Sequence, residues 1–136
     1  MEKELKLEAK LENITHVISF VETELELLNC PMKTTLLIDT VIDELFSNIA
    51  MYAYGDSIGY AWIKVDYDPD KRLVTFKLSD EGIPYNPLEK DDPDITLEAE
   101  DRPIGGLGIY IAKKAMDTMT YERKDGKNIL TLGKVI

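Results

Sequence analysis

Two short turn sequences, each placed between runs of alternating polar and apolar residues, constrain the fold of this chain most strongly. Residues 68–71 read Asp-Pro-Asp-Lys, and residues 124–127 read Lys-Asp-Gly-Lys. Aspartate, proline and glycine favour tight turns, and Asp-Gly between alternating runs predicts a β-hairpin. The strands that these turns would join are residues 58–67 with 73–79, and residues 118–123 with 128–134. Two hairpins predict a sheet in which most neighbouring strands are antiparallel.

A further strand and two helices are predicted ahead of the first hairpin. Residues 4–11 alternate between apolar and charged side chains, which indicates a half-buried strand. Asn13 can then cap a helix whose apolar residues recur at helical spacing. Pro31 suits the first turn of a second helix, which we expect to end just before Gly55.

A third helix is predicted to begin at the glycine-rich residues 105–108, between the two hairpins. Helices that connect the strands of one sheet must bury their apolar stripes against it. We therefore predict an α/β (α+β) two-layer sandwich, with a mixed, mostly antiparallel sheet covered on one face by three helices. With 136 residues, 44% of them hydrophobic, the chain is long enough for one packed domain, residues 1–136, and too short for two ordinary ones.

Residues 83–104 form a long loop with four prolines and no sustained period. A loop of this length in a compact domain is more often a functional lid than a simple connector. From Glu89 to Arg102 it holds seven acidic and two basic residues, a balance of −5 within a total net charge of −10. Most of these side chains, taken singly, are expected to lie on a solvated surface.

The composition makes some partners improbable. A net charge of −10 disfavours nonspecific binding of nucleic acid and a polybasic attachment to membranes. No apolar run approaches the roughly 20 residues that span a bilayer. A single cysteine, Cys30, cannot build an internal disulfide framework, which fits a reducing compartment. We therefore expect a cytoplasmic protein with no nucleic-acid or membrane partner.

The second predicted helix carries a polar row. Glu44, Asn48 and Tyr52 recur every four residues, so they share one helix face. The amide oxygen of Asn48 is a hard ligand that suits Mg²⁺. Glu44, one turn earlier, could orient a nucleophile and receive its proton. The alternative is an ordinary polar stripe on the surface.

Residues 79–87, Ser-Asp-Glu-Gly-Ile-Pro-Tyr-Asn-Pro, follow an alternating strand. Asp80 stands where a strand would deliver a carboxylate into a cleft, and Gly82 lacks a side chain that could block a flat ligand. A carboxylate can accept a hydrogen bond from an amine, so the pair could grip the edge of an adenine. The alternative is a turn without a ligand.

Residues 105–108, Gly-Gly-Leu-Gly, precede the third predicted helix. Glycines let backbone amides approach anionic oxygens, and the helix N-terminus favours negative charge. The sequence has no Walker-type phosphate loop, and its context does not match a dinucleotide-binding βαβ unit.

Taken in this order, the three segments resemble the asparagine and glycine boxes of the GHKL ATPase superfamily, whose members have a Bergerat-type, histidine-kinase-like ATP-binding fold. Within it, the chain is most similar to the small anti-sigma-factor serine kinases. The run Pro-Tyr-Asn-Pro at residues 84–87 and the pattern Gly-Gly-Leu-Gly-Ile-Tyr-Ile-Ala both match that group. The resemblance extends from about residue 11 to residue 132.

The resemblance implies ATP and Mg²⁺ as cofactors and assigns roles to individual residues. Asp80 would accept the adenine amine, with Gly82 giving clearance. Asn48 would hold Mg²⁺ against the phosphates, and Glu44 would be the general base toward a serine or threonine hydroxyl. The other cofactor-binding residues that it implies are Pro84, Arg102, Gly105, Gly106, Leu107 and Gly108. The lid would be residues 83–104.

The resemblance also implies partners: an anti-anti-sigma factor of the STAS type as substrate, a sigma factor as second ligand, and a second copy in a homodimer. Tyr52 stands where the group often has histidine, and the lid is acidic. These departures leave open an alternative, a nucleotide-gated partner-binding switch without phosphoryl transfer. The catalytic fragment of a sensor histidine kinase ranks below both, because no phosphoacceptor helix pair precedes the first strand.

Three other features of the sequence are expected to have structural or surface roles. His16 is expected at the surface and has no second histidine with which to bind a metal. Cys30 is expected to fill space at a helix junction. Tyr60 and Trp62 share a strand face, where packing or a dimer interface would use them.

Overall fold

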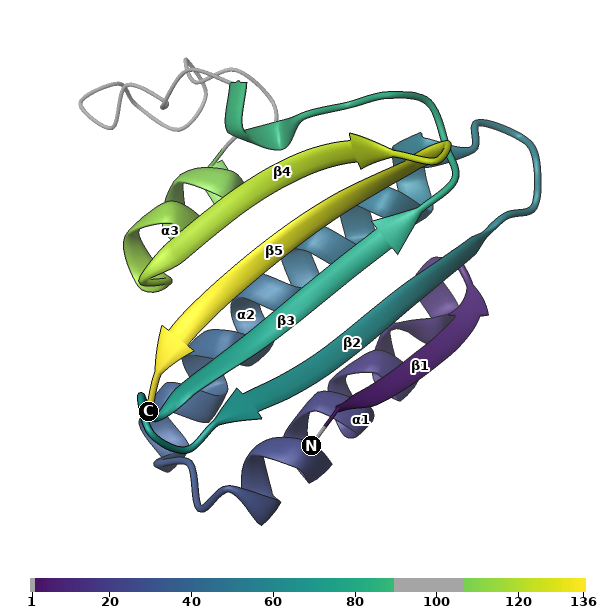
Figure 1. Ribbon diagram of the computed structural model, residues 1–136. Coiled ribbons are helices and arrows are strands. Elements are labelled where there is room, and N and C mark those ends of the chain that lie inside the picture. Colours follow the sequence, from purple (N-terminus) through teal and green to yellow (C-terminus); the bar gives the residue numbers. More distant parts are fainter. Residues whose placement is uncertain (1, 90–106) are drawn as a thin grey trace, which may run out of the picture.

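The computed structural model describes residues 2–89 and 107–136 (Figure 1). The strands are β1 (Lys3–Glu8), β2 (Tyr60–Asp68), β3 (Leu73–Asp80), β4 (Thr118–Lys124) and β5 (Lys127–Val135). The helices are α1 (Ile14–Leu27), α2 (Met32–Asn48) and α3 (Leu107–Ala115). Short 3₁₀ turns lie at η1 (Leu11–Asn13) and η3 (Pro87–Glu89), and a π-helical segment, η2 (Ile49–Ala53), continues α2.

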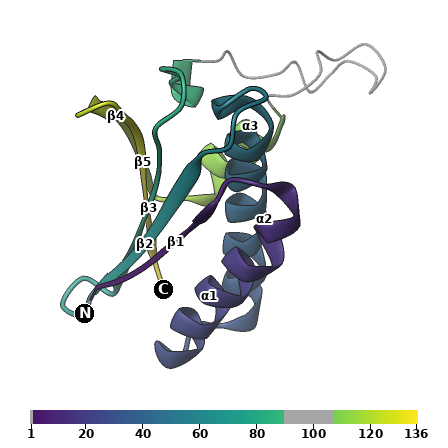
Figure 2. The same cartoon turned by 90° about the vertical axis from the view of Figure 1, so that its right-hand side faces the viewer.

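The five described strands form one sheet in the order β1-β2-β3-β5-β4. Every neighbouring pair is antiparallel, so the described sheet contains no parallel pair of the kind that a mixed sheet would have. The helices cover one face of the sheet, and its other face is open (Figure 2). The predicted two-layer α+β sandwich is thereby confirmed.

Both predicted hairpins form. Asp125 and Gly126 have positive φ angles of 52° and 78°, as the tight turn between β4 and β5 requires. Gly55, with a φ of 59°, ends the second helix where it was predicted to end.

The core lies between the sheet and the helices, and the alternation of the strands produces it. In β2 and β3, every second residue from Ala61 to Val65 and from Val74 to Leu78 is buried. Phe46 of α2 and Phe76 of β3 are fully buried at its centre. Each such side chain contributes about 1.5–3 kcal/mol by leaving water.

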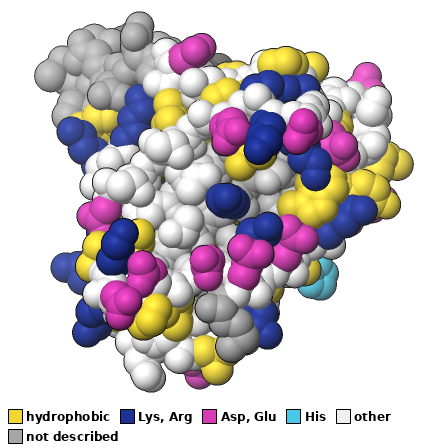
Figure 3. All heavy atoms as spheres, in the orientation of Figure 1, with side chains coloured by type: hydrophobic (Ala, Val, Ile, Leu, Met, Phe, Trp, Pro, Cys, Tyr) yellow, Lys and Arg dark blue, Asp and Glu magenta, His cyan; other side chains and the backbone are white. Residues whose placement is uncertain are grey.

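The open face of the sheet carries a different set of side chains. Trp62 lies there with the ammonium groups of Lys127 and Lys6 at 3.9 and 5.5 Å from its ring centroid. Tyr60, next to it, also lies under Lys6 at 4.5 Å. Figure 3 shows this face, with basic and acidic side chains interspersed. The two aromatic side chains are therefore packed against lysines and are not part of the core.

Three predicted details at the ends of elements are wrong. The first strand ends at Glu8, short of residue 11, because the chain turns into η1. Asn13 does not cap α1 with its side chain, since its Nδ2 donates instead to the carbonyl oxygen of Glu8 at 2.9 Å. Pro31 lies just before α2 in an extended conformation, with ψ of 141°, rather than inside its first turn. No helix in the described part of the chain is long and apolar enough to cross a membrane.

A carboxyl group lies poorly compensated between α1 and α2. Oδ1 of Asp39 is buried and has no hydrogen-bond partner among the described residues. Burial raises the pKa of Asp39 to about 7, and the negative charge of the Glu22 carboxylate adds to the effect. The folded protein therefore holds a proton on Asp39 that the unfolded chain releases at acid pH.

We expect Asp39→Asn to stabilise the protein at pH 8 relative to the wild type, and to do so much less at pH 4. The pKa of Asp39 is raised in the folded state, so the stability that its protonated form contributes is lost as pH rises from about 4 to about 7. Asparagine imitates the neutral acid and has no such loss. Thermal unfolding of both proteins between pH 4 and 8 measures the difference.

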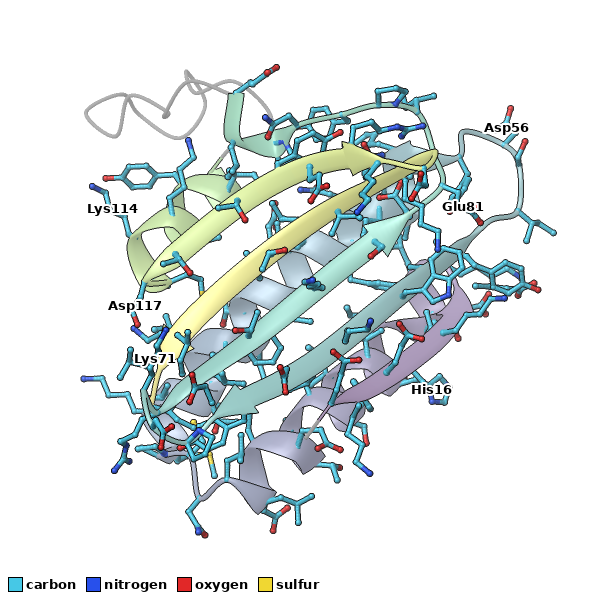
Figure 4. All side chains as sticks on the ribbon, in the orientation of Figure 1. His16, Asp56, Lys71, Glu81, Lys114 and Asp117 are labelled. Carbon is cyan, nitrogen blue, oxygen red and sulfur yellow. The ribbon has the colours of Figure 1, made fainter. Side chains whose placement is uncertain are left out.

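Asp56→Asn, in an exposed loop (Figure 4), is the control, and its effect on the melting temperature is expected to be small throughout. A stability difference for Asp39→Asn that stays constant from pH 4 to 8 would contradict the assignment.

Candidate functional site

A cavity of about 310 Å³ opens at the end of the sheet where β3 stops and the hairpin of β4 and β5 begins. Its walls are mostly apolar, with Leu45 and Ile49 from the second helix and Leu78 and Leu130 from the sheet. Its polar side chains include Asn48, Tyr52, Asp80, Tyr121 and Asn128. An apolar cavity with a few converging polar groups is typical of a small-molecule site.

Asp80 is the acidic group of this cavity. It is the last residue of β3 and only 5% exposed. Its Oδ1 accepts two hydrogen bonds of 2.9 Å, from the backbone N–H of Gly82 and from Nδ2 of Asn128. Its Oδ2 accepts none from the described residues. Asp80 therefore has one oxygen held by the protein and one available to a donor in the cavity.

The pKa of Asp80 is raised overall above the ordinary value of an aspartate. Burial raises the pKa of Asp80, while the hydrogen bonds from Asn128 and Gly82 and the positive charge of Arg123 lower it. These two donors and one cation favour the charged form of Asp80 and so keep the carboxylate available as an acceptor.

Gly82 is required by the packing of the turn after β3. A Cβ atom on Gly82 would lie 2.2 Å from the carbonyl oxygen of Ala53, at the end of η2. The same oxygen accepts a hydrogen bond of 3.0 Å from the N–H of Ile83. Arg123 adds a bond of 2.9 Å from Nη1 to the carbonyl of Gly82. Gly82 does not line the cavity itself, so its clearance for a ligand stays a prediction.

Tyr54 also holds the turn after β3 in place, and this role was not predicted from the sequence. Its hydroxyl donates to the carbonyl of Tyr60 and accepts a hydrogen bond of 2.7 Å from the N–H of Glu81. Burial raises the pKa of Tyr54. Gly59 leaves room for it, because a Cβ there would overlap the Tyr54 ring. Figure 4 labels Glu81 at the end of β3.

Asn128 was also missed, although the sequence contains a signal for it. It is 7% exposed and stands in β5 in alternation with the buried residues Leu130 and Leu132. A polar residue in the buried register of a strand needs partners. Its amide makes hydrogen bonds to Asp80 and to the segment that follows it.

The polar row of α2 reaches the cavity in part. Asn48 and Tyr52 line it, and Tyr52 is 61% exposed. The side chain of Asn48 makes no hydrogen bond with any described residue, so its amide oxygen is available to a metal ion. The π-helical segment η2 begins directly after Asn48, and such segments often occur at functional sites.

Glu44 lies beside the cavity and not in its wall. Its side chain packs on the first turn of α3, where a Cβ on Gly108 would come within 1.9 Å of the Glu44 Cδ. The structure therefore brings together Glu44 and Gly108, which the sequence places 64 residues apart. A glycine at this position lets the carboxylate lie directly on the helix backbone.

The remaining predicted site residues fall in three groups. Pro84 is exposed and does not line the cavity, whereas its neighbours Ile83 and Tyr85 do. Leu107 begins α3, but its side chain lies outside the described structure. Arg102, Gly105, Gly106 and most of the predicted lid lie outside the described residues as well.

Neither His16 nor Cys30 lines the cavity. His16 is exposed on the outer side of α1 (Figure 4). Cys30 is a free, half-buried thiol whose Sγ lies 3.7 Å from the carbonyl oxygen of Pro31. Within residues 2–89 and 107–136, no group of three or more His, Cys, Asp and Glu side chains could hold a metal ion.

Comparison with known proteins gives two matches. A family model described as histidine kinase-like ATPase domain matches residues 7–134. The chain is also similar to the serine/threonine-protein kinase BtrW of Bordetella bronchiseptica, with 30% identity over 90 residues. That match covers 66% of this chain and 63% of the length of the relative.

We expect Gly82→Ala to destabilise the protein by about 1–3 kcal/mol, the usual cost of overpacking a close contact. The added Cβ would meet the Ala53 backbone, which cannot move aside as a flexible side chain would. Urea unfolding followed by circular dichroism measures the loss.

The control is Glu81→Ala, an exposed neighbour whose effect should stay within about 0.5 kcal/mol. Equal stability of the Gly82→Ala protein and the wild type would show that the turn does not need this close approach.

Proposed function

The chain belongs to the histidine kinase-like ATPase family, and we propose that it is an ATP- and Mg²⁺-dependent anti-sigma-factor serine/threonine protein kinase. The observation that carries the proposal is the half-satisfied carboxylate of Asp80 in an apolar cavity, with Asn48 and Glu44 on the adjacent helix.

The adenine would occupy the apolar part of the cavity. Leu78, Leu130 and Ile49 offer flat apolar surface to the rings, and Oδ2 of Asp80 would accept a hydrogen bond from the exocyclic amine. A hydrogen bond to a charged acceptor contributes about 1.5–3 kcal/mol. The cavity volume of about 310 Å³ lies at the lower end of the usual range for ligand sites, which suits a base.

Asn48 fits a role as ligand of Mg²⁺. Its amide oxygen is a hard donor at the cavity wall with no competing hydrogen bond from the described residues. Mg²⁺ usually takes only one or two protein ligands and completes its shell with phosphate oxygens and water. When bound, the ion would neutralise charge on the phosphates. Asn48 would thereby fix where the phosphates leave the base pocket.

Glu44 would act as the general base of the transfer. It would accept the proton of a partner's serine or threonine hydroxyl as the oxygen attacks the terminal phosphorus of ATP. The bond to the bridging oxygen breaks, and ADP leaves. Its packing on Gly108 holds the carboxylate at the contact between α2 and α3, beside the cavity. Positioning of this kind and electrostatics supply most of the catalysis in phosphoryl transfer.

The partners are part of the same proposal. The substrate would be an anti-anti-sigma factor of the STAS type, the second ligand a sigma factor, and the working unit a homodimer in the cytoplasm. The similarity to a protein named serine/threonine-protein kinase supports the protein-kinase assignment.

A second candidate is a nucleotide-gated switch that binds a partner without phosphoryl transfer. The position of Glu44 outside the cavity wall favours this candidate. A carboxylate that does not face the ligand could not take a proton during transfer, whereas nucleotide binding does not require it. The exposed Tyr52, in place of a titratable histidine, fits this candidate too.

Asp80→Asn should weaken ATP binding by about ten- to a hundredfold. Oδ1 of Asp80 accepts two N–H groups, so the amide oxygen must take its place. The amide NH₂ then faces the cavity and meets the adenine amine, donor against donor. Isothermal titration calorimetry with ATP and Mg²⁺ measures the change.

Glu81→Gln, next in the chain and exposed, is the matched control and should bind ATP as the wild type does. Undiminished ATP affinity in Asp80→Asn would refute the placement of the adenine.

Glu44→Gln should reduce phosphate transfer to a partner by about 10²–10⁴-fold, the range for loss of a general base. ATP affinity should change less than about twofold, because glutamine keeps the shape that packs on Gly108. The assay uses labelled ATP, Mg²⁺ and a purified STAS-type protein, and follows label on a partner serine. Asp43→Asn, the exposed preceding residue, is the control.

If Glu44→Gln transferred phosphate as fast as the wild type, Glu44 would not be the general base. Tight ATP binding by a wild type that transfers no phosphate would select the switch instead.

A further inference from the structure

The side-chain amide of Asn128 makes four hydrogen bonds at the end of the cavity next to Asp80. It lies directly opposite Asp80 in the pairing of β3 with β5. Its Nδ2 donates to Oδ1 of Asp80 at 2.9 Å and to the carbonyl oxygen of Ile83 at 2.8 Å. Its Oδ1 accepts from the N–H of Tyr85 at 3.1 Å and from the hydroxyl of Tyr121.

These four bonds use the whole capacity of an asparagine amide, two donors and two acceptor positions. The orientation of the amide is thereby fixed. Turning it over would set its NH₂ against the N–H of Tyr85 and its oxygen against the carboxylate of Asp80. Asn128 therefore always offers a donor to Asp80.

The donor determines which oxygen of Asp80 faces the ligand. Oδ1 is held by Asn128 and by the N–H of Gly82, so Oδ2 is the acceptor that remains. The same amide holds Ile83 and Tyr85, which form one edge of the cavity. A single buried side chain thus sets both the recognising atom and the shape of the edge beside it.

We propose that Asn128 is the positioning residue that gives the site its preference for a base with an exocyclic amine, adenine, over one with a carbonyl group there, guanine. The inference rests on the proposed binding of a nucleotide. Asn128 acts through Asp80 and the cavity edge, and it need not touch the base.

Tyr121 offers a control position within the same hydrogen-bond network. Its hydroxyl bonds to Oδ1 of Asn128, on the side of the amide that faces away from Asp80. Removal of this hydroxyl leaves both donors of Asn128 in place. A variant at Tyr121 therefore disturbs the same hydrogen-bond network without removing a donor from Asp80.

Loss of the Asn128 donor should also change the response to pH. The hydrogen bond from Asn128 lowers the pKa of Asp80, as do the N–H of Gly82 and the charge of Arg123 on β4. Among the described residues, the hydroxyl of Tyr54 and the carboxylate of Glu81 lie close to Asp80 as well. The cavity wall that Asp80 shares also contains three tyrosines, Tyr52, Tyr85 and Tyr121. Without the donor the pKa of Asp80 rises further, so its protonation, and the loss of its acceptor, begins at a higher pH.

The test measures affinities for ATP and for GTP, each with Mg²⁺, by calorimetry between pH 5 and 8. The proteins are the wild type, Asn128→Asp and Tyr121→Phe. Asn128→Asp keeps the shape of the side chain and the acceptors for Tyr85 and Tyr121. In its ionised form it has no donor for Asp80 or for the carbonyl oxygen of Ile83. Asn128→Ala is the second variant, should the paired carboxylates prevent folding.

We expect Asn128→Asp to reduce the ratio of ATP to GTP affinity about tenfold, the loss of one charge-assisted hydrogen bond. The midpoint of the fall in ATP affinity at acid pH should move upward. Tyr121 lines the cavity as well, so we expect Tyr121→Phe to lower both affinities together while the ratio and the midpoint stay those of the wild type.

Three results would overturn the inference. If both nucleotides weaken equally in Asn128→Asp and Asn128→Ala, with an unchanged midpoint, Asn128 has only a structural role. If Tyr121→Phe lowers the ratio as much as Asn128→Asp, the preference does not depend on the donor to Asp80. A wild type that binds neither nucleotide would refute the proposed function together with this inference, whereas the first two results are compatible with ATP binding by the wild type.

Discussion

The close approach of the turn after β3 to the end of the second helix is the constraint on which the rest of the site depends. Backbone meets backbone where Gly82 lies against Ala53, and the N–H of Ile83 bonds to the Ala53 carbonyl. This contact closes the end of the two layers over the cavity. It also places Asp80 on the inner face of β3, in the same buried register as Phe76 and Leu78. A carboxylate in that register must be compensated, and the surrounding donors do so.

That compensation explains why three elements converge at one point. Gly82 gives a backbone donor, Asn128 a side-chain donor from β5 and Arg123 a positive charge from β4. Asp39, between α1 and α2, is the contrasting case, because burial and the nearby Glu22 raise its pKa and no donor opposes them. Among the described residues, Asp80 is thus a buried carboxyl group that is kept as an acceptor, whereas Asp39 is a half-buried one whose raised pKa keeps it protonated up to near neutral pH. Asp80 lines the cavity.

The sequence predicted what is determined locally and missed what depends on pairing across the sheet. The hairpin turns, the helix stop at Gly55 and the alternation of β2 and β3 follow from neighbouring residues, and all of them form. The cap at Asn13 failed because Asn13 already has helical backbone angles in η1, and its side chain is held toward a carbonyl oxygen of β1. Asn128 meets Asp80 across 48 residues of chain, and only the register of β3 with β5 reveals it. The approach of Gly82 to Ala53 is equally non-local.

In the proposed function, the residues for base recognition and for phosphate transfer belong to different elements. Asp80 and Asn128 belong to the sheet and are fixed by its hydrogen bonds, whereas Glu44 is placed by the contact of α2 with α3. Asn48 lies between them, at the junction of α2 with the π-helical segment that supports the turn of Gly82. Glu44 packs on Gly108 of α3, and the next residue of α3, Ile109, lines the cavity. A shift of α3 against α2 would therefore change the surroundings of both the carboxylate and the cavity. Under the proposed function, nucleotide binding and phosphate transfer would therefore both depend on how α3 packs on α2, and the kinase and the switch would use the same cavity.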